Sequence, residues 1–284
     1  MDYQNIIYET EDRIARIILN RPEKMNALSF ATRLEIVDAL KRAERDESVR
    51  VVIVKGAGRT FSAGYDLQDA GRADPNSPPS LYISKRLDRV SGQDHFVKLD
   101  HWMTSWNLLK PVIAQIHGYC LAGATEMTSL MDMRIVAEDA QIGYPPMRNL
   151  NFGNVLMPPW LMGISKAKEY CFTGDSMDGK EAYRVGWATR VYPADKLEEE
   201  TEKLAQRIAL VETDLIMMTK RAINRTYEIM GLKVAMDVTN DVAVLASYRE
   251  SAGEFQRAIR EKGLKAALEE RDAPFKDYRT AVKR

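Results

Sequence analysis

The segment HGYCLAGATEM, residues 117–127, places one carboxylate, that of Glu126, among residues that are mostly small or apolar. The apolar run before it predicts a strand, and the small residues predict a turn into a helix that starts near Gly123. Amides at a helix N-terminus lack partners and carry a partial positive charge, which suits an oxyanion that forms during a reaction. A glutamate in the first helical turn either interacts with the helix dipole or, in an apolar setting, serves as an acid–base group.

Two further segments could face a ligand. Residues 60–67, TFSAGYDL, have small side chains that would let a ligand approach the backbone, although any tight turn has a similar composition. Residues 141–154, QIGYPPMRNLNFGN, predict a strand end followed by an irregular polar loop. In that loop Arg148 could pair with a substrate carboxylate, or it is a surface arginine or one paired with Glu138 or Asp139.

Alternating strand and helix patterns position these segments. Four strands are predicted from apolar runs, at residues 14–19, 49–54, 112–116 and 133–136. Ser29 is a candidate N-cap of a helix, and the apolar stripe of this helix is Leu34, Val37, Leu40 and Ala43. Because the strand runs lack the alternation of a half-exposed strand, we expect parallel strands covered by helices, and therefore the α/β fold class.

The remainder of the chain divides into a polar stretch and a helical one. Residues 70–80 predict an exposed loop, and the polar sequence on to about residue 100 is a surface excursion or a lid. From about residue 195 the pattern is helical, at residues 197–210, 214–230, 234–247 and 253–271. Their apolar stripes have few predicted partners, and such stripes are commonly buried against another subunit. We therefore predict a catalytic core of residues 1–195 and a helical oligomerisation region of residues 196–284.

Composition argues against several classes of protein. The 284 residues hold 41 Lys and Arg against 41 Asp and Glu, so the net charge gives no electrostatic sign of a nucleic-acid-binding protein. No apolar run approaches the roughly 18 to 20 residues of a membrane helix, and the polar, acidic start does not resemble a signal peptide. Isolated cysteines and scattered histidines predict neither disulfides nor a metal site. We expect a cytoplasmic protein without a metal, membrane or nucleic-acid partner.

Six motifs in a fixed order resemble the crotonase superfamily, the enoyl-CoA hydratase/isomerase family. They are LNRPEKMNALS (19–29), TFSAGYDL (60–67), HGYCLAGATE (117–126), AQIGYPP (140–146), FTGDSMDGKEAYRVGWATRV (172–191) and APFKD (273–277). The resemblance implies a spiral of ββα turns and a helical C-terminal trimerisation region. It also implies a homotrimer or a dimer of trimers that acts on an acyl-CoA substrate in fatty acid metabolism.

The resemblance implies roles for four residues in the reaction. The backbone N–H groups of Tyr65, which follows an Ala-Gly pair, and of Gly123 would form an oxyanion hole for the thioester carbonyl. Glu126 matches the first of two glutamates that the family's hydratases use to activate one water and deliver its proton. Asn154 falls in a loop position close to the reacting carbons.

Further residues are implied to bind the CoA part of the substrate, and no separate cofactor is implied. Phe275 and Lys276 would reach the adenine and phosphates of CoA, in one arrangement across a subunit boundary. The residues that would line the CoA chain and the acyl group are Lys24, Ala27, Ser62, Ala63, Asp66, Leu67, Gln68 and Tyr144.

One position departs from the family's pattern. The second glutamate of the hydratases should directly follow Pro145, and this chain has Pro146 there. Proline can neither donate nor accept a side-chain proton, so the two-glutamate addition of water does not carry over intact. A single carboxylate can still act as a general base toward water or toward a C–H group beside the thioester.

Several functions stay open after this departure. The first in order is an enoyl-CoA hydratase-like lyase in which Glu126 is the base and a water held by Asn154 or Tyr144 replaces the missing acid. The second is a CoA-thioester hydrolase or an enzyme that cleaves a carbon–carbon bond. A decarboxylating member of the family would fit Tyr65, a residue able to hydrogen-bond after the Ala-Gly pair, but the tyrosine that such enzymes carry in the later loop aligns with Gly153. The last is a non-catalytic acyl-CoA-binding protein.

Large apolar side chains suggest a hypothesis about the acyl group. They could line a pocket for a cyclic or branched acyl group, or they form plain core; they are Tyr144, Trp102, Trp106, Trp160, Met127, Met147, Met157 and Met162. Asp132 follows Glu126 by six residues and would point away from it, so we interpret Asp132 as structural.

Overall fold

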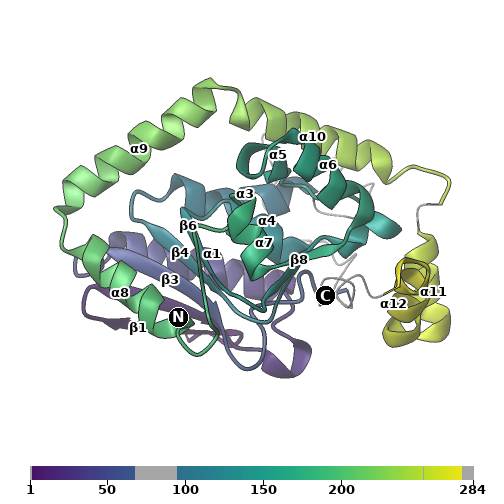
Figure 1. Ribbon diagram of the computed structural model, residues 1–284, viewed down its shortest axis with the longest axis horizontal. Coiled ribbons are helices and arrows are strands. Elements are labelled where there is room, and N and C mark those ends of the chain that lie inside the picture. Colours follow the sequence, from purple (N-terminus) through teal and green to yellow (C-terminus); the bar gives the residue numbers. More distant parts are fainter. Residues whose placement is uncertain (1, 68–94, 252, 277–284) are drawn as a thin grey trace.

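Two sheets form the centre of the protein (Figure 1). The computed structural model describes residues 2–67, 95–251 and 253–276, so Gln68 and the predicted loop at 70–80 lie outside the described residues. Within these ranges the larger sheet has the order β1-β2-β3-β4-β6-β9, and its strands are Ile6–Glu11, Ile14–Leu19, Val51–Gly56, Val112–Ile116, Met133–Ala137 and Arg190–Tyr192. The smaller sheet has the order β5-β7-β8, and its strands are Tyr119–Leu121, Gln141–Gly143 and Ser176–Asp178.

The four predicted strands are β2, β3, β4 and β6, and they pair with one another in parallel as expected. Every residue of β4 is buried, as are the first four residues of β3. Both faces of these strands are therefore covered, which explains why their apolar runs show no alternation. The sequence pattern does not predict β1, because this edge strand is mostly exposed and half polar. It pairs with β2 in the antiparallel direction.

The predicted helix after Ser29 is α1, Phe30–Arg45. The Ser29 Oγ accepts a hydrogen bond from the Thr32 N–H at 3.1 Å, so the N-cap prediction is confirmed. The predicted apolar stripe is partly wrong, because Leu34 is 44% exposed while Ile36 and Ala39 are buried. The buried apolar face of the helix consists of the residues at positions 36, 39, 40 and 43.

Helix α3, His95–Asn107, begins inside the stretch that the sequence predicts as a surface excursion or lid. Its first turns mix charged and apolar residues, which hides the helical period from a sequence reading. It packs beside α1, and its Trp102 is almost completely buried. Trp102 and Lys98 of this helix contact Tyr65.

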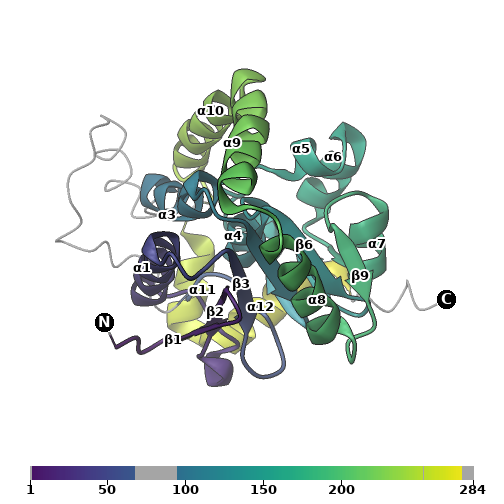
Figure 2. The ribbon, with the colours of Figure 1, turned by 90° about the vertical axis from the view of Figure 1, so that its left-hand side faces the viewer.

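The C-terminal helices are α8 (Leu197–Ala209), α9 (Thr213–Ile229), α10 (Leu232–Ala246), α11 (Glu254–Lys262) and α12 (Leu264–Asp272). The sequence predicts one helix over 253–271, but Gly263 at φ +81° separates it into α11 and α12. Helix α8 packs on the strands of the larger sheet, and Figure 2 shows it on the other side from α1. In the view of Figure 1, helices α9 and α10 follow the upper edge of the molecule, and α11 and α12 lie at its right-hand side.

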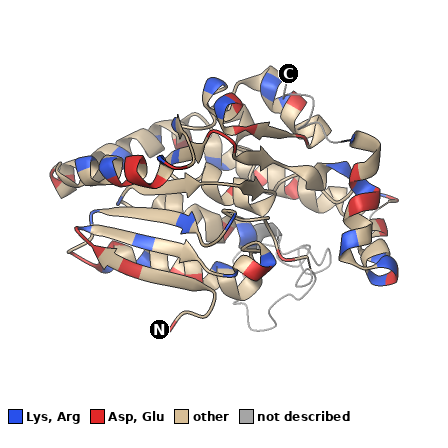
Figure 3. Ribbon diagram, turned by 60° about the horizontal axis from the view of Figure 1, so that its bottom comes forward, with Lys and Arg blue, Asp and Glu red and all other residues tan. Residues whose placement is uncertain are grey.

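Short elements complete the described chain: η1 (Pro22–Lys24), α4 (Gly123–Ser129), η2 (Pro145–Arg148), α5 (Pro158–Leu161), α6 (Ile164–Thr173), α7 (Gly179–Arg184) and η3 (Ala273–Phe275). Figure 3 shows acidic and basic residues side by side along the helices. None of the helices among the described residues is long and apolar enough to cross a membrane.

Candidate active site

Two glycines allow the loop after β3 to approach the start of α4. The loop pairs with β5 through the Ser62 N–H, which donates to the Tyr119 carbonyl at 2.9 Å. Gly64 has φ +94°, and a Cβ there would lie 2.5 Å from the Leu121 carbonyl oxygen. A Cβ at Gly123 would lie 2.5 Å from a ring carbon of Tyr65. Both positions therefore require glycine, and together they bring Tyr65 against the first residue of α4.

The two amides predicted for the oxyanion hole lie in this contact. Gly123 is the first residue of α4, so its N–H has no partner inside the helix. Among the turn and loop hydrogen bonds between described backbone groups, none uses the N–H of Tyr65 or of Gly123. Two unpaired donors on adjoining segments can bind one carbonyl oxygen, which is the arrangement that an enolate oxyanion needs.

Glu126 lies in the first turn of α4 and is 2% exposed. Its Oε2 accepts a hydrogen bond from the Tyr65 hydroxyl at 2.5 Å. Its Oε1 accepts from the Tyr144 hydroxyl and from the Asn154 backbone N–H, each at 2.8 Å. Burial raises the pKa of Glu126 above its usual value, and the hydrogen bonds from these donors partly oppose that shift. The sequence thus singled out Glu126 and the three residues that bond to it as candidate site residues, but it did not predict the hydrogen bonds between them.

The side chain of Tyr65 belongs to a second set of contacts that the sequence did not predict. The Trp102 Nε1 donates to the Tyr65 hydroxyl at 2.8 Å. The Lys98 ammonium lies 4.6 Å from the centroid of the Tyr65 ring, and the Arg33 guanidinium lies 5.7 Å from it. Burial and the charge of Glu126 raise the pKa of Tyr65 well above its usual value. The phenol therefore stays protonated at neutral pH and acts as a donor.

Asn154 contacts Glu126 through its backbone N–H, although the sequence suggests its side chain as a group that holds a water. The Asn154 carbonyl accepts from the Asn240 side chain of α10 at 3.3 Å, which links this loop to the C-terminal helices. The preceding Gly153 passes close to the carboxylate, because a Cβ there would lie 2.8 Å from Glu126 Oε1. This glycine was the available sequence signal that the backbone approaches the site.

A large cavity of about 1420 Å³ lies in front of this cluster. The predicted binding residues that line it are Lys24, Ala27, Ala63, Tyr65, Asp66, Leu67, Tyr144, Asn154 and Lys276. Ser62 does not line it, because its buried hydroxyl donates to the Asn26 carbonyl and accepts from the Gly64 N–H. Glu126 instead borders a cavity of about 30 Å³, room for about one water molecule. Tyr144 and Phe152 line both cavities.

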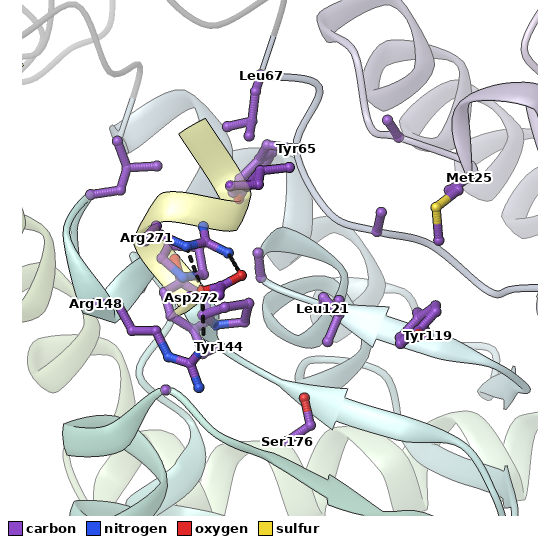
Figure 4. A pocket seen from close by; sticks show the side chains of 18 of the residues that line it. Met25, Tyr65, Leu67, Tyr119, Leu121, Tyr144, Arg148, Ser176, Arg271 and Asp272 are labelled. Atoms are coloured by element: carbon purple, nitrogen blue, oxygen red, sulfur yellow. Dashed lines mark hydrogen bonds and ion pairs between the residues drawn. The ribbon is translucent and has the colours of Figure 1, made fainter. Parts of the chain in front are cut away.

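The C-terminal segment closes one side of the large cavity (Figure 4). Arg148 forms ion pairs with Asp175 at 2.7 Å and with Asp272, the last residue of α12, at 2.9 Å. Its guanidinium also lies 4.3 Å from the centroid of the Phe275 ring. The suggested partners Glu138 and Asp139 were therefore wrong for Arg148, because residues distant in sequence neutralise its charge. These contacts hold the C-terminal turn against the loop that carries Tyr144.

The large apolar side chains of the acyl-group hypothesis do not gather in one pocket. Trp102 bonds to Tyr65, Trp106 Nε1 donates to Glu228 at 3.1 Å, and Trp160 packs against the Tyr227 ring. Three of the methionines are buried in the core, and Met147 and Tyr144 border the small cavity. These contacts give no support to the expectation of a bulky acyl group.

Known proteins resemble this chain along almost its whole length. The family model described as Enoyl-CoA hydratase/isomerase matches residues 9–279. A crotonyl-CoA hydratase of Syntrophomonas wolfei is 30% identical over 97% of this chain and 99% of its own. A short-chain-enoyl-CoA hydratase of Clostridium acetobutylicum is 29% identical over 95% and 97%.

Solved structures agree with these sequence matches. The crystal structure of an enoyl-CoA hydratase/isomerase from Xanthobacter autotrophicus Py2 is 34% identical and superposes with a TM-score of 0.87, covering 96% of this chain and 99% of that one. An enoyl-CoA hydratase from Mycobacterium smegmatis gives a TM-score of 0.84 at 31% identity, covering 96% of each chain. The predicted fold, an α/β crotonase fold with a helical C-terminal region, is confirmed. The chain belongs to the enoyl-CoA hydratase/isomerase family, whose members act on acyl-CoA thioesters.

Proposed function

We propose that this protein is a lyase that adds water to the double bond of an enoyl-CoA thioester. The observation that carries the proposal is the buried Glu126 carboxylate, which lies beside the backbone amides of Tyr65 and Gly123. Among the described residues these amides have no partner, and the groups that donate hydrogen bonds to the carboxylate are all neutral. A carboxylate with a raised pKa and no ion-paired partner is suited to take a proton from water. Glu126 is therefore assigned as the general base.

The amides of Tyr65 and Gly123 stabilise the enolate that forms when the hydroxide oxygen bonds to Cβ. Both donors are positioned by the bridges from Tyr65 to Leu28 and from Ser62 to Cys120 of β5, and by the close approach of Gly64 to Leu121. Loss of one such donor costs on the order of 10²- to 10³-fold in rate. The large cavity in front of them accommodates the CoA part of the substrate, along Lys24, Leu67 and Lys276.

The proposed chemistry uses one carboxylate. We assign the place of the hydratases' second glutamate to Pro146, which lines the large cavity and offers no proton. Similar proteins named crotonyl-CoA hydratase and short-chain-enoyl-CoA hydratase favour water addition over the other chemistries. The remaining family reactions become outcomes of the test below.

The exposed apolar residues of the C-terminal helices support the proposal of a homo-oligomer, a trimer or a dimer of trimers. Apolar side chains of this size rarely stay exposed along a whole helix face in a monomer. Those exposed on α9 and α10 are Leu215, Met218, Ile223, Tyr227, Ile229, Val234, Val238, Val242 and Leu245. In this proposal the division near residue 195 separates the catalytic part from the part that assembles.

The experiment is incubation of the purified protein with a panel of enoyl-, 3-oxo- and malonyl-type CoA thioesters of several chain lengths, followed by mass spectrometry. We expect enoyl-CoA to gain one water, and the Glu126→Gln variant to lose this activity. Release of free CoA would instead show a hydrolase, and loss of carbon dioxide a decarboxylase. Binding of thioesters without any turnover would show a non-catalytic binding protein.

A further inference from the structure

The side chain of Tyr65 has contacts that the oxyanion hole does not explain, because only its backbone N–H serves that hole. Its hydroxyl carries a single hydrogen. The Trp102 Nε1 can only donate, and it does so to the phenol oxygen at 2.8 Å. The hydrogen of the phenol must therefore point to Glu126 Oε2, at 2.5 Å. This geometry fixes Tyr65 as the donor to the carboxylate.

The two phenols that bind Glu126 differ in what surrounds them. Besides Trp102, the cations of Lys98 and Arg33 lie over the Tyr65 ring, at 4.6 and 5.7 Å from its centroid. A donor to the oxygen and nearby positive charge are what a transient phenolate needs. Among the described residues, the only hydrogen bond of the Tyr144 hydroxyl is the one to Glu126. Of the two phenols, Tyr65 is therefore the one whose described neighbours would stabilise a phenolate.

Tyr65 also lies between Glu126 and the substrate cavity. Tyr65 is one of the residues that line the large cavity (Figure 4), whereas Glu126 is not. Its ring packs so closely on Gly123 that a Cβ there would clash at 2.5 Å. A thioester carbonyl bound by the amides of Tyr65 and Gly123 would thus place its neighbouring Cα beside the phenol. One residue would contact both the carbonyl oxygen and the carbon next to it.

We propose that the Tyr65 phenol donates the proton to Cα, in place of the second carboxylate that Pro146 cannot supply; this rests on the proposed addition of water. Water loses a proton to Glu126 as its oxygen bonds to Cβ, and the electron pair of the double bond moves to Cα and the thioester oxygen. The resulting enolate takes the proton of Tyr65. Protonated Glu126 then returns a proton to the phenolate, so that one water is added and both side chains are restored.

The test is exchange of the Cα hydrogens of butanoyl-CoA with deuterated water, followed by NMR, because this reaction needs proton transfer at Cα but no addition of water. The wild-type protein should exchange them. Tyr65→Phe should exchange about 100-fold more slowly or worse, whereas the matched control Tyr144→Phe, which removes the other phenol from the same carboxylate, should lose less than about 10-fold. Trp102→Phe should give a smaller loss than Tyr65→Phe and shift the pH dependence of exchange.

A spectroscopic measurement separates the proposal from a structural defect. Hydrogen bonds from the oxyanion hole should polarise the carbonyl of a bound aryl enoyl-CoA and move its absorbance to longer wavelength. This shift should persist in Tyr65→Phe because the backbone N–H remains. Exchange by Tyr65→Phe at the wild-type rate, or an equal loss in Tyr144→Phe, would overturn the proposal. If Tyr65→Phe loses the absorbance shift, its oxyanion hole is damaged, and the Trp102→Phe variant becomes the test. Exchange of Cα hydrogens by Trp102→Phe at the wild-type rate would then overturn the proposal.

The proposal and the proposed function can fail separately. Wild-type protein that adds water but exchanges no Cα hydrogen refutes the role of Tyr65 alone. Wild-type protein that exchanges Cα hydrogens through Tyr65 but adds no water refutes the hydratase function and leaves Tyr65 as the proton carrier. Protein that does neither refutes both.

Discussion

Glu126 and Asp132 lie six residues apart in the sequence, yet the protein surrounds their carboxylates in opposite ways. Asp132 Oδ2 accepts from the Lys220 ammonium and from the Val112 N–H, each at 2.7 Å. Among the described residues, no cation forms an ion pair with Glu126, whose donors are two phenols and one amide. The expectation that Asp132 points away from Glu126 agrees with these contacts.

The difference shows how the same chemical group can be fixed or left reactive. Burial raises the pKa of both carboxyls, and at Asp132 the adjacent Lys220 opposes that effect with a full charge. A paired charge holds the fold but has little tendency to take a proton from another molecule. Neutral donors orient Glu126 while leaving a lone pair of its oxygens available for a proton.

The largest expected effect is on activity, at Glu126, the carboxylate that is surrounded by neutral donors. Glu126→Gln should lower kcat/KM for enoyl-CoA by about 10³-fold, because the amide cannot act as a base. Its free energy of unfolding should fall by no more than about 2 kcal/mol, because the amide has nearly the same shape and its oxygen can still accept from Tyr144 and from the Asn154 N–H, so that only the bond from Tyr65 is lost. Steady-state kinetics and urea denaturation measure the two quantities. A large loss of stability with activity retained would reverse our assignment of the two carboxylates.

The second-largest expected effect is on stability, at Asp132, the carboxylate that is paired with Lys220. Asp132→Asn should lower the free energy of unfolding by about 3 kcal/mol, because it leaves the Lys220 ammonium buried without a counter-ion. The Lys220 side chain is only 6% exposed. The control is Lys180→Met, which breaks the exposed pair with Glu138 and should change stability little. Equal losses in the two variants, measured by urea denaturation, would contradict the comparison.

The smallest effect is a shift in pH dependence. Because the base must be ionised and burial raises its pKa, the acid limb of the kcat/KM profile should lie above 4.5, the ordinary value for glutamate. The Tyr144 hydroxyl favours the ionised form, so Tyr144→Phe should raise the pKa further and move the limb to higher pH. A limb that stays in place or moves to lower pH in this variant would show that Tyr144 does not act on Glu126.

Short-range patterns made much of the fold predictable from the sequence. The buried strands β2 and β4 begin and end at the predicted residues, and Ser29 caps its helix. Contacts between side chains that lie far apart in the sequence could not be predicted in this way. Trp102 reaches Tyr65 from a helix whose mixed composition conceals its period, and Arg148 reaches Asp272 from a segment far away in the chain. The predicted helix over 253–271 failed at Gly263, since a single glycine does not by itself indicate a break.

The most direct test of the central claim, that Glu126 activates water for addition to an enoyl thioester, is a labelling experiment in water enriched in heavy oxygen. Wild-type protein and Glu126→Gln are incubated with crotonyl-CoA, and the products are analysed by mass spectrometry. We predict one heavy oxygen in the 3-hydroxyacyl-CoA formed by wild type, and almost no product from the variant. Heavy oxygen in a free acid with release of CoA, or equal labelling by both proteins, would contradict the claim.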